Sequence, residues 1–203
     1  MTRGRHVPVE HPLVMPPAAV RRILDMGATR LRLPVKCGTS FVNGVRAGLA
    51  RWRDLRLDEA AAGDAALVVD GDAVTCRFEP ETRLWVREAY HADHPPEHYA
   101  DRFRDRDGLY YRADHPAGYG GCVWREAETM PCAMSRIDLE VVSVRPVRLL
   151  DAGADEVALH GFNGPTSVQD MLDAYHDQHG GRMATGPAAN PWTWDLLVNV
   201  RAG

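Results

Sequence analysis

The chain has 203 residues, of which 45% are hydrophobic and 26% are charged, which suits one domain with a single apolar core. The formal net charge is −4, so the protein has no overall positive field, and any contact with nucleic acid requires a local basic patch. No stretch approaches the roughly 18 apolar residues of a membrane span, and no targeting peptide is evident. We therefore predict a cytoplasmic protein with one domain, residues 1–203, and no membrane contact.

The N-terminal part predicts a strand, a helix and a second strand. Residues 11–15 are apolar, and prolines then stand where a helix can begin. Apolar residues recur at helical spacing over residues 16–27, and glycine ends the pattern. Residues 29–33 alternate, which predicts an extended strand with Arg30 and Arg32 on one face.

The central part predicts strands separated by two insertions. Residues 37–64 are basic and rich in glycine, with no sustained periodicity, and we interpret them as an insertion. Residues 65–78 contain two short strands around a turn, which predicts a β-hairpin. A further strand is predicted over residues 83–90, and a second insertion follows over residues 91–121.

The C-terminal part predicts the longest strand, two helices and a final strand. Residues 136–150 alternate over most of their length. Short helices are predicted over residues 155–160 and from Thr166, where a capping-box pattern occurs, and the last strand covers residues 192–200. Strands mostly follow strands, so we predict an α+β fold, with a small mixed or antiparallel β-barrel and flanking helices.

The strand over residues 83–90 is the first candidate site. Its alternation predicts that Leu84 and Val86 enter the core while the other face presents Trp85, Arg87 and Glu88. An indole can stack on a base, and a guanidinium and a carboxylate can recognise its polar edges. The alternative is an Arg–Glu pair that braces the fold, with Trp85 in the core.

Two further groups can extend a binding surface. Thr29, Arg30 and Arg32 are suited to a phosphate or ribose, although the same residues also fit a solvated strand face. Trp124 and Arg136 combine an aromatic ring with a cation and are candidate ligand-binding residues. The alternative is that Trp124 packs and Arg136 makes a structural ion pair.

The sequence contains a histidine-rich segment, which is a candidate for metal binding, and four cysteines, which are candidates for thiol chemistry. Imidazole and carboxylate groups are zinc ligands, but the spacing here matches no standard zinc motif, so we predict a polar loop with no metal and no cofactor. The residues concerned are His91, Asp93, His94, His98 and Asp101.

None of the four cysteines forms a Cys-x-x-Cys pair, which favours free thiols. A thiol–imidazole pair of Cys132 with His160 is one hypothesis that the sequence leaves open.

Four segments together resemble one family. They are VMPPAAVRRILDMGATRLRLPVK, RLWVREAY, VWREAETMPCAMSRIDLEVVSVRPVRLLD and NPWTWDLLVNV. The chain resembles the ASCH domain of the PUA-like superfamily, in the form found in phage and prophage proteins. The resemblance implies a small β-barrel with a cleft beside the helices, and a ligand that is RNA or a modified nucleoside.

Some ASCH proteins are amidohydrolases that remove the acetyl group from N4-acetylcytidine, and others have been linked to RNA cleavage. The amidohydrolase pattern has a Lys-Thr-x-Thr run and a later glutamate. Here Ala28 stands at the lysine position, Thr29 at the first threonine and Leu31 at the second, and the glutamate position falls near His160. The only lysine, Lys36, lies about 26 Å further along an extended chain, so the resemblance does not carry the amidohydrolase activity over.

Three hypotheses follow. The first is a PUA-like ASCH domain that binds RNA or a modified nucleoside and is largely non-catalytic. The second is a hydrolase of N4-acetylcytidine type, or a ribonuclease, with His160 and Glu88 as rearranged acid and base. The third is a phage-encoded module for a protein partner, recognised through residues 37–64 and 91–121.

Overall fold

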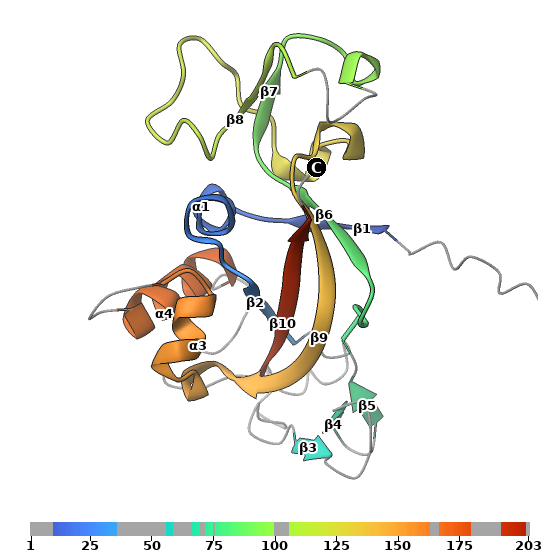
Figure 1. Ribbon diagram of the computed structural model, residues 1–203, viewed down its shortest axis with the longest axis vertical. Coiled ribbons are helices and arrows are strands. Elements are labelled where there is room, and N and C mark those ends of the chain that lie inside the picture. Colours follow the sequence, from blue (N-terminus) through green and yellow to red (C-terminus); the bar gives the residue numbers. More distant parts are fainter. Residues whose placement is uncertain are drawn as a thin grey trace, which may run out of the picture. The chain divides into compact units, whose positions relative to one another are not determined.

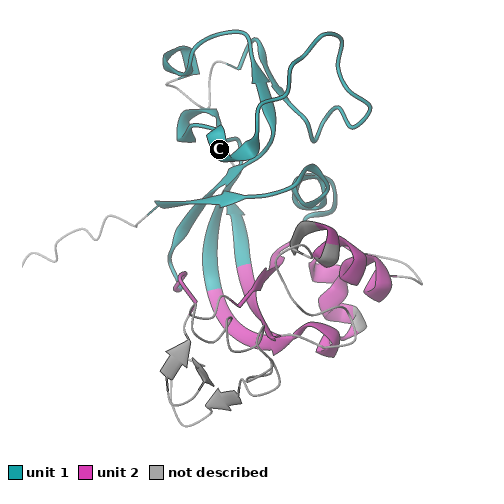
Figure 2. Cartoon of the chain, turned by 180° about the vertical axis from the view of Figure 1, so that it is seen from behind, with its two compact units in different colours: residues 1–27, 80–142, 198–203 teal, residues 28–79, 143–197 magenta. Residues whose placement is uncertain are grey.

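The computed structural model divides the chain into two compact units, coloured separately in Figure 2. Unit 1 comprises residues 1–27, 80–142 and 198–203, and unit 2 comprises residues 28–79 and 143–197. The expected single domain stays a prediction. The structure describes residues 10–35, 56–58, 66–69, 72–74, 76–99, 106–162, 167–179 and 192–201.

The largest sheet has five strands in the order β1-β6-β9-β10-β2 and is mixed (Figure 1). Strand β1 runs parallel to β6, whereas the β6–β9 and β10–β2 pairs are antiparallel. The α+β class is therefore confirmed, while closure into a barrel is not detected among the described strands. The strands are β1 (Glu10–Val14), β2 (Arg30–Pro34), β6 (Arg83–Arg87), β9 (Asp138–Arg148) and β10 (Trp192–Arg201).

Helix α1 (Pro17–Met26) belongs to unit 1 and follows from its sequence signals. Its apolar stripe is buried through Ala19, Val20 and Ile23. Gly27 ends the helix in the left-handed conformation, with φ of 64°, and its N–H bonds back into the last turn. Glycine adopts this conformation at little cost, so the predicted helix and its end are confirmed.

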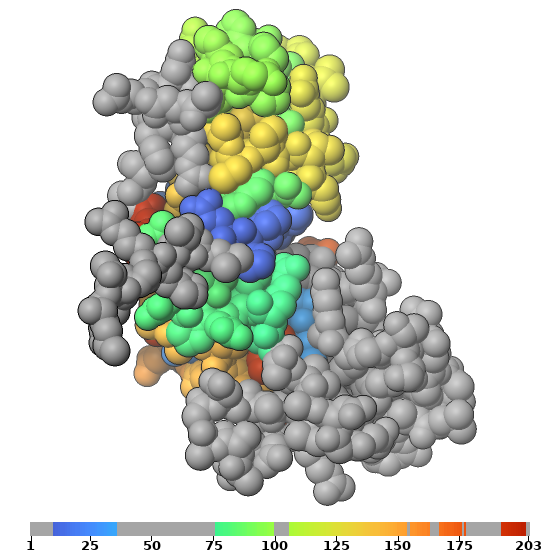
Figure 3. All heavy atoms as spheres, turned by 90° about the vertical axis from the view of Figure 1, so that its right-hand side faces the viewer, coloured from blue at the N-terminus to red at the C-terminus, as the bar shows by residue number. Residues whose placement is uncertain are grey.

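Unit 1 also contains two short strands, β7 (Tyr90–Ala92) and β8 (Leu109–Tyr111), which pair antiparallel. Figure 3 shows blue atoms of the N-terminal segment directly against green atoms of the central segment with which β1 pairs. Three short 3₁₀ helices complete the described part of the unit, and a buried aromatic and methionine cluster forms its core around Tyr99, Met130 and Met134. The 3₁₀ helices are Pro96–Tyr99, Ala127–Thr129 and Cys132–Met134.

The strand predicted over residues 83–90 corresponds to β6, and the predicted burial of Leu84 and Val86 is confirmed. The predicted exposure of Trp85 and Glu88 on the other face is wrong, and Trp85 lies in the core, as the alternative interpretation has it. Leu84, Trp85 and Val86 are all buried, and Glu88 directly after the strand is 1% exposed. Position between β1 and β9 gives β6 hydrogen-bonding neighbours in the plane of the sheet, whereas burial of both faces requires side chains packed over each face, as the Arg87 guanidinium is over the Trp85 ring. Strands buried on both faces typically have continuous apolar runs, and the run Leu84-Trp85-Val86 was such a signal, which the interpretation as alternation overlooked.

Unit 2 combines β2 with most of β9 and β10 and two helices, α3 (Ala154–Leu159) and α4 (Ser167–His179). Both helices lie close to their predicted positions. Leu149 from a 3₁₀ turn (Leu149–Asp151) packs with Leu172 and Tyr175 of α4 in a buried cluster.

A separate antiparallel sheet is formed by β3 (Arg56–Asp58), β4 (Ala66–Val69) and β5 (Asp72–Val74). The β4–β5 pair confirms the predicted hairpin. Of the insertion expected over residues 37–64, only β3 lies within the described residues. Among all described residues, no helix has the length and apolar character needed to cross a membrane.

Candidate functional site

The candidate site of unit 2 begins with the pairing of two strands. In the antiparallel β2–β10 ladder, Asp195 lies directly opposite Arg32. Arg30 is two residues from Arg32, so both side chains leave the same face of β2 and both reach the Asp195 carboxylate. The predicted common face of the two arginines is therefore confirmed.

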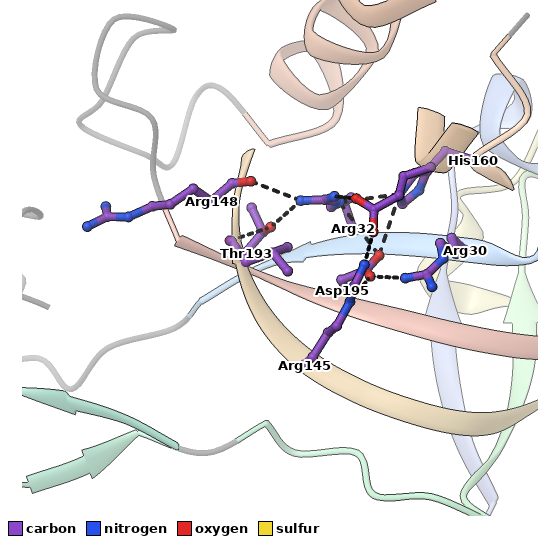
Figure 4. A network of polar contacts seen from close by, with 9 residues as sticks. Arg30, Arg32, Arg145, Arg148, His160, Thr193 and Asp195 are labelled. Atoms are coloured by element: carbon purple, nitrogen blue, oxygen red, sulfur yellow. Dashed lines mark hydrogen bonds and ion pairs between the residues drawn. The ribbon is translucent and has the colours of Figure 1, made fainter. Parts of the chain in front are cut away.

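Asp195 is the centre of the site, and its side chain is 0% exposed (Figure 4). Arg30 donates a short hydrogen bond to Oδ2. Arg145 of β9 donates to the same oxygen through Nε at 2.9 Å. A carboxylate so deeply buried requires such partners, because desolvation of an unpaired charge is costly.

The buried Arg32 guanidinium contacts a backbone carbonyl, a threonine hydroxyl and the side chains of His160 and Asp195. Nη1 donates to the Arg148 carbonyl at 3.1 Å and to Thr193 Oγ1 at 3.4 Å. Nε donates to His160 Nε2 at 3.3 Å and lies 3.6 Å from Asp195 Oδ1. Burial lowers the pKa of Arg32, while Asp195 acts in the opposite direction.

His160, directly after α3, is 5% exposed. Burial lowers its pKa to about 4, and the neighbouring Asp195 only partly opposes this shift. The imidazole is therefore neutral at pH 7, and its Nε2 lone pair accepts the hydrogen bond from Arg32. A lone pair used in this way is not free to remove a proton from a substrate.

Glu156 of α3 adds a second carboxylate. It bonds Arg145 closely and lies 3.5 Å from Nη2 of Arg32. Three guanidinium groups thus face two carboxylates, and the neutral His160 leaves one surplus positive charge. We call this set the Asp195 cluster, and its members are Arg30, Arg32, Arg145, Glu156, His160, Thr193 and Asp195.

Hydrogen bonding inside the Asp195 cluster is incomplete. Nε of Arg30, Nη2 of Arg32 and Oδ1 of Asp195 are buried and have no hydrogen-bond partner. The cluster also reaches the surface, because the Arg145 side chain is 44% exposed. Buried N–H groups that lack a hydrogen-bond partner beside surplus positive charge are suited to an anionic ligand.

Thr29 lies at the entrance to β2 and is half-buried. Its backbone N–H donates to the Leu159 carbonyl at 2.9 Å. This bond holds the start of β2 beside the end of α3, where His160 follows. Ala28, which stands at the lysine position of the resembled family, is 1% exposed.

The candidate residues near β6 belong to unit 1 and contact protein groups, although Nε of Arg87 is buried without a hydrogen-bond partner. Trp85 is buried, and the Arg87 guanidinium lies 4.6 Å from its ring centroid. Arg87 also donates to the Glu128 carbonyl at 3.0 Å. One face of the indole is therefore covered by a cation from the same strand, which favours the bracing interpretation over stacking on a ligand.

Glu88 and Arg136 form a saturated ion pair in unit 1. Arg136 donates to both Glu88 oxygens, at 2.8 and 3.0 Å, and to both Asp114 oxygens, at 2.7 and 3.0 Å. Arg136 also lies 4.0 Å from the Tyr111 ring centroid. We call Glu88, Arg136 and Asp114 the Arg136 brace, which matches the structural alternative for Arg136. Glu88 and His160 fall in different units, and their predicted acid–base pairing stays a prediction.

Trp124 is half-buried in unit 1, and the Arg112 guanidinium lies 5.4 Å from its ring. It belongs to a group of aromatic side chains that was not predicted. Cys132 is also in unit 1, so its proposed pairing with His160 of unit 2 stays a prediction. Cys76, Cys122 and Cys132 form no disulfide, as expected for free thiols; Cys37 lies outside the described residues.

The histidine-rich segment, predicted to be a polar loop without metal, is only partly described. His94 and His98 have ring centroids 4.3 Å apart, close to a 3₁₀ helix. Within the described part of the chain, no group of three potential ligands is suited to a metal ion. Asp101 and Lys36 lie outside the described residues.

Sequence reasoning did not identify four members of the Asp195 cluster: Arg145, Glu156, Thr193 and Asp195. A signal for Asp195 existed, because it is the one carboxylate in the apolar strand sequence WTWDLLV. A lone charge in a strand read as buried requires a cationic partner, and Arg30 and Arg32 were the available basic pair on a neighbouring strand. No such local signal marks Arg145 or Glu156.

Comparison of the whole chain with family models, curated proteins and solved structures gave no match.

Proposed function

We propose that the protein binds RNA or a modified nucleoside, as a PUA-like ASCH domain would, through the Asp195 cluster of unit 2. The observation that carries the proposal is the excess of guanidinium groups over carboxylates around a buried aspartate. The unpaired N–H groups of Arg30 and Arg32 support an anionic partner. A phosphate or a base carbonyl oxygen supplies the acceptors that these donors lack.

The resemblance and the geometry point to the same region. The family pattern has its lysine and threonines at the start of β2 and its glutamate near the end of α3. In this chain the Thr29 N–H bonds the Leu159 carbonyl, so these two segments are adjacent. The proposed ligand site therefore occupies the position of the family's chemistry, with arginines instead of a lysine nucleophile.

The proposal is for binding without lysine-based amide hydrolysis. Ala28 has no amine, and the His160 lone pair accepts a hydrogen bond from Arg32. The site thus has groups that hold an anion, whereas a free nucleophile and base are not among its described members.

Calorimetric titration with mononucleotides and nucleosides tests the proposal. The panel contains CMP, UMP, AMP and GMP beside cytidine, uridine and N4-acetylcytidine. We expect at least one compound to bind, and Arg30→Met to weaken it about 10-fold or more, because a hydrogen bond to a charged group is worth about 1.5–3 kcal/mol. Arg201→Met is the matched control, since Arg201 bonds Glu140 at an exposed position of unit 1.

Two results would contradict the proposal. One is the absence of binding by every compound in the panel. The other is equal affinity of the Arg30→Met, Arg201→Met and unmodified proteins for a compound that does bind. Release of acetate from N4-acetylcytidine would instead support the hydrolase alternative.

A further inference from the structure

Aromatic side chains of strand β8 and of the segment that follows it in unit 1 contact one another; Figure 1 shows the course of the backbone there. Tyr110 and Tyr119 stack with ring centroids 5.0 Å apart. His115 lies 4.4 Å from Tyr119 and, nearly parallel, 6.3 Å from Trp124. We call these four residues the aromatic surface.

The aromatic surface is held by its own backbone. The Cys122 N–H bonds the Tyr119 carbonyl at 2.9 Å, and the Gly118 N–H bonds the His115 carbonyl at 2.9 Å. Gly118 and Gly121 have φ of 97° and 80°, values that favour glycine over other residues. Local turns rather than a hydrophobic core therefore determine where the rings lie.

The rings remain open to solvent. Tyr119 is 47% exposed, and Tyr110, His115 and Trp124 are only half-buried. Val123 is the one large aliphatic side chain that is exposed in the described segment 106–125. A surface of flat rings with so little aliphatic material differs from the apolar centre of a typical protein interface.

The charged groups beside the rings include one arginine, Arg112, and the acidic Asp93 and Asp107. Burial, together with these carboxylates, raises the pKa of Tyr110. The Arg112 guanidinium lies 5.4 Å from the Trp124 ring. Two nearby acidic side chains have cationic or imidazole partners, since Asp93 bonds His91 at 3.0 Å and Asp114 bonds Arg136. The arginine is therefore placed to contact a phosphate while the rings contact bases.

We propose that the aromatic surface binds single-stranded nucleic acid by stacking unpaired bases on Tyr119 and Trp124, with Arg112 contacting the backbone. Every base has a π-face, so such binding tolerates different sequences. The inference goes beyond the proposed function, because it assigns a second binding site on unit 1, whereas the Asp195 cluster belongs to unit 2. Either can hold without the other.

Fluorescence anisotropy with labelled RNA tests the inference. The probes are oligoadenylate and oligouridylate of about 12 nucleotides, within the site sizes of single-strand binders, and a duplex of equal length. We expect the single strands to bind more tightly than the duplex, in which the bases are stacked and covered. Because stacking tolerates salt better than phosphate contacts do, a part of the binding should survive an increase in salt.

Two substitutions at one exposed position separate stacking from other contacts. Tyr119→Phe keeps the ring and should bind within about 2-fold of the unmodified protein, whereas Tyr119→Leu should bind at least about 5-fold more weakly, since base–aromatic stacking corresponds to about 5- to 100-fold in affinity. Tyr119 is 47% exposed, so neither change should unfold the protein. Trp124→Leu should have an effect of the same direction.

Equal binding by Tyr119→Leu and Tyr119→Phe, equal binding of duplex and single strand, or no binding of either RNA would overturn the inference. The last result would leave a protein partner as the explanation for the exposed rings. Mononucleotide binding should be unchanged in Tyr119→Leu and reduced in Arg30→Met, which distinguishes failure here from failure of the proposed function.

Discussion

The two charged groups of the molecule differ in how completely their hydrogen bonds are made. In the Arg136 brace of unit 1, one guanidinium makes four hydrogen bonds to two carboxylates, and all four carboxylate oxygens accept. In the Asp195 cluster of unit 2, three guanidinium groups share two carboxylates, and two buried donor nitrogens and one acceptor oxygen have no hydrogen-bond partner.

We interpret this difference as one between structural charge and the charge that we propose to bind a ligand. A saturated buried network rigidifies its surroundings and has no donor left for another molecule. An unsaturated one costs free energy in the absence of a ligand, and a ligand that completes it recovers part of that cost. The sequence offered both arginine groups as binding candidates, and their hydrogen-bond completeness now ranks the Asp195 cluster first.

The largest expected effect comes from removing the central charge of the Asp195 cluster. Asp195→Asn leaves Arg30, Arg32 and Arg145 with one carboxylate between them. Loss of one partner from a buried ion pair costs about 3–5 kcal/mol, so we expect the free energy of unfolding to fall by this amount in urea denaturation.

Asp114→Asn is the matched control for that change. Asp114 also makes two hydrogen bonds to an arginine, but its side chain is 42% exposed. Exposed ion pairs contribute about 0–1 kcal/mol. Equal destabilisation by both substitutions would show that burial of Asp195 does not set the strength of its cluster.

The second effect is a pH dependence that originates in the Asp195 cluster. His160 has a folded-state pKa of about 4, below the roughly 6.5 of the unfolded chain. Between these values the unfolded state binds more protons, so stability is full above pH 6.5 and decreases as the pH falls toward 4. The loss reaches about 3 kcal/mol.

His160→Gln tests this assignment, because a glutamine oxygen can replace Nε2 as the acceptor for Arg32 without titrating. Between pH 7.5 and 4, the unfolding free energy of the unmodified protein should fall by about 3 kcal/mol relative to that of His160→Gln. Comparison of the pair cancels the titration of other groups. Parallel curves for both proteins from pH 7.5 to 4 would rule out His160 as the source.

Local signals predicted most of the elements. Proline before α1 and Gly27 after it determine that helix, and alternation identified β9 within two residues at each end. The β4–β5 hairpin followed from its turn. These features depend on neighbouring residues in the chain, so one sequence is sufficient to find them.

The site required contacts that a single sequence does not contain. The burial of Trp85 depends on which side chains pack over its face of β6, and local alternation does not report that packing. Arg32 and Asp195 are 163 positions apart in the sequence (195 − 32), and they lie opposite each other because β2 pairs with β10. That register is a tertiary property, so the arginine pair was found and its carboxylate was missed.

The smallest expected loss of unfolding free energy, compared with those for Asp195 and His160, is in the Arg136 brace, which we interpret as structural. Glu88→Gln keeps the shape of a side chain that is 1% exposed but removes its charge. Arg136 retains Asp114, so we expect a loss of about 2 kcal/mol, within the range for a hydrogen bond to a charged group. Glu140→Gln, which alters the exposed pair with Arg201, should cost about 0–1 kcal/mol.

The nucleotide affinity of Glu88→Gln shows whether the Arg136 brace acts on stability alone or also on binding. A saturated brace should affect stability alone, so the variant should bind nucleotides as the unmodified protein does, while Arg30→Met should lose binding at a temperature at which it is still folded. The measurement is the same calorimetric titration, performed well below the melting temperature of each variant. A loss of affinity in Glu88→Gln equal to that in Arg30→Met would mean that hydrogen-bond completeness does not distinguish structural from ligand-binding arginines in this protein.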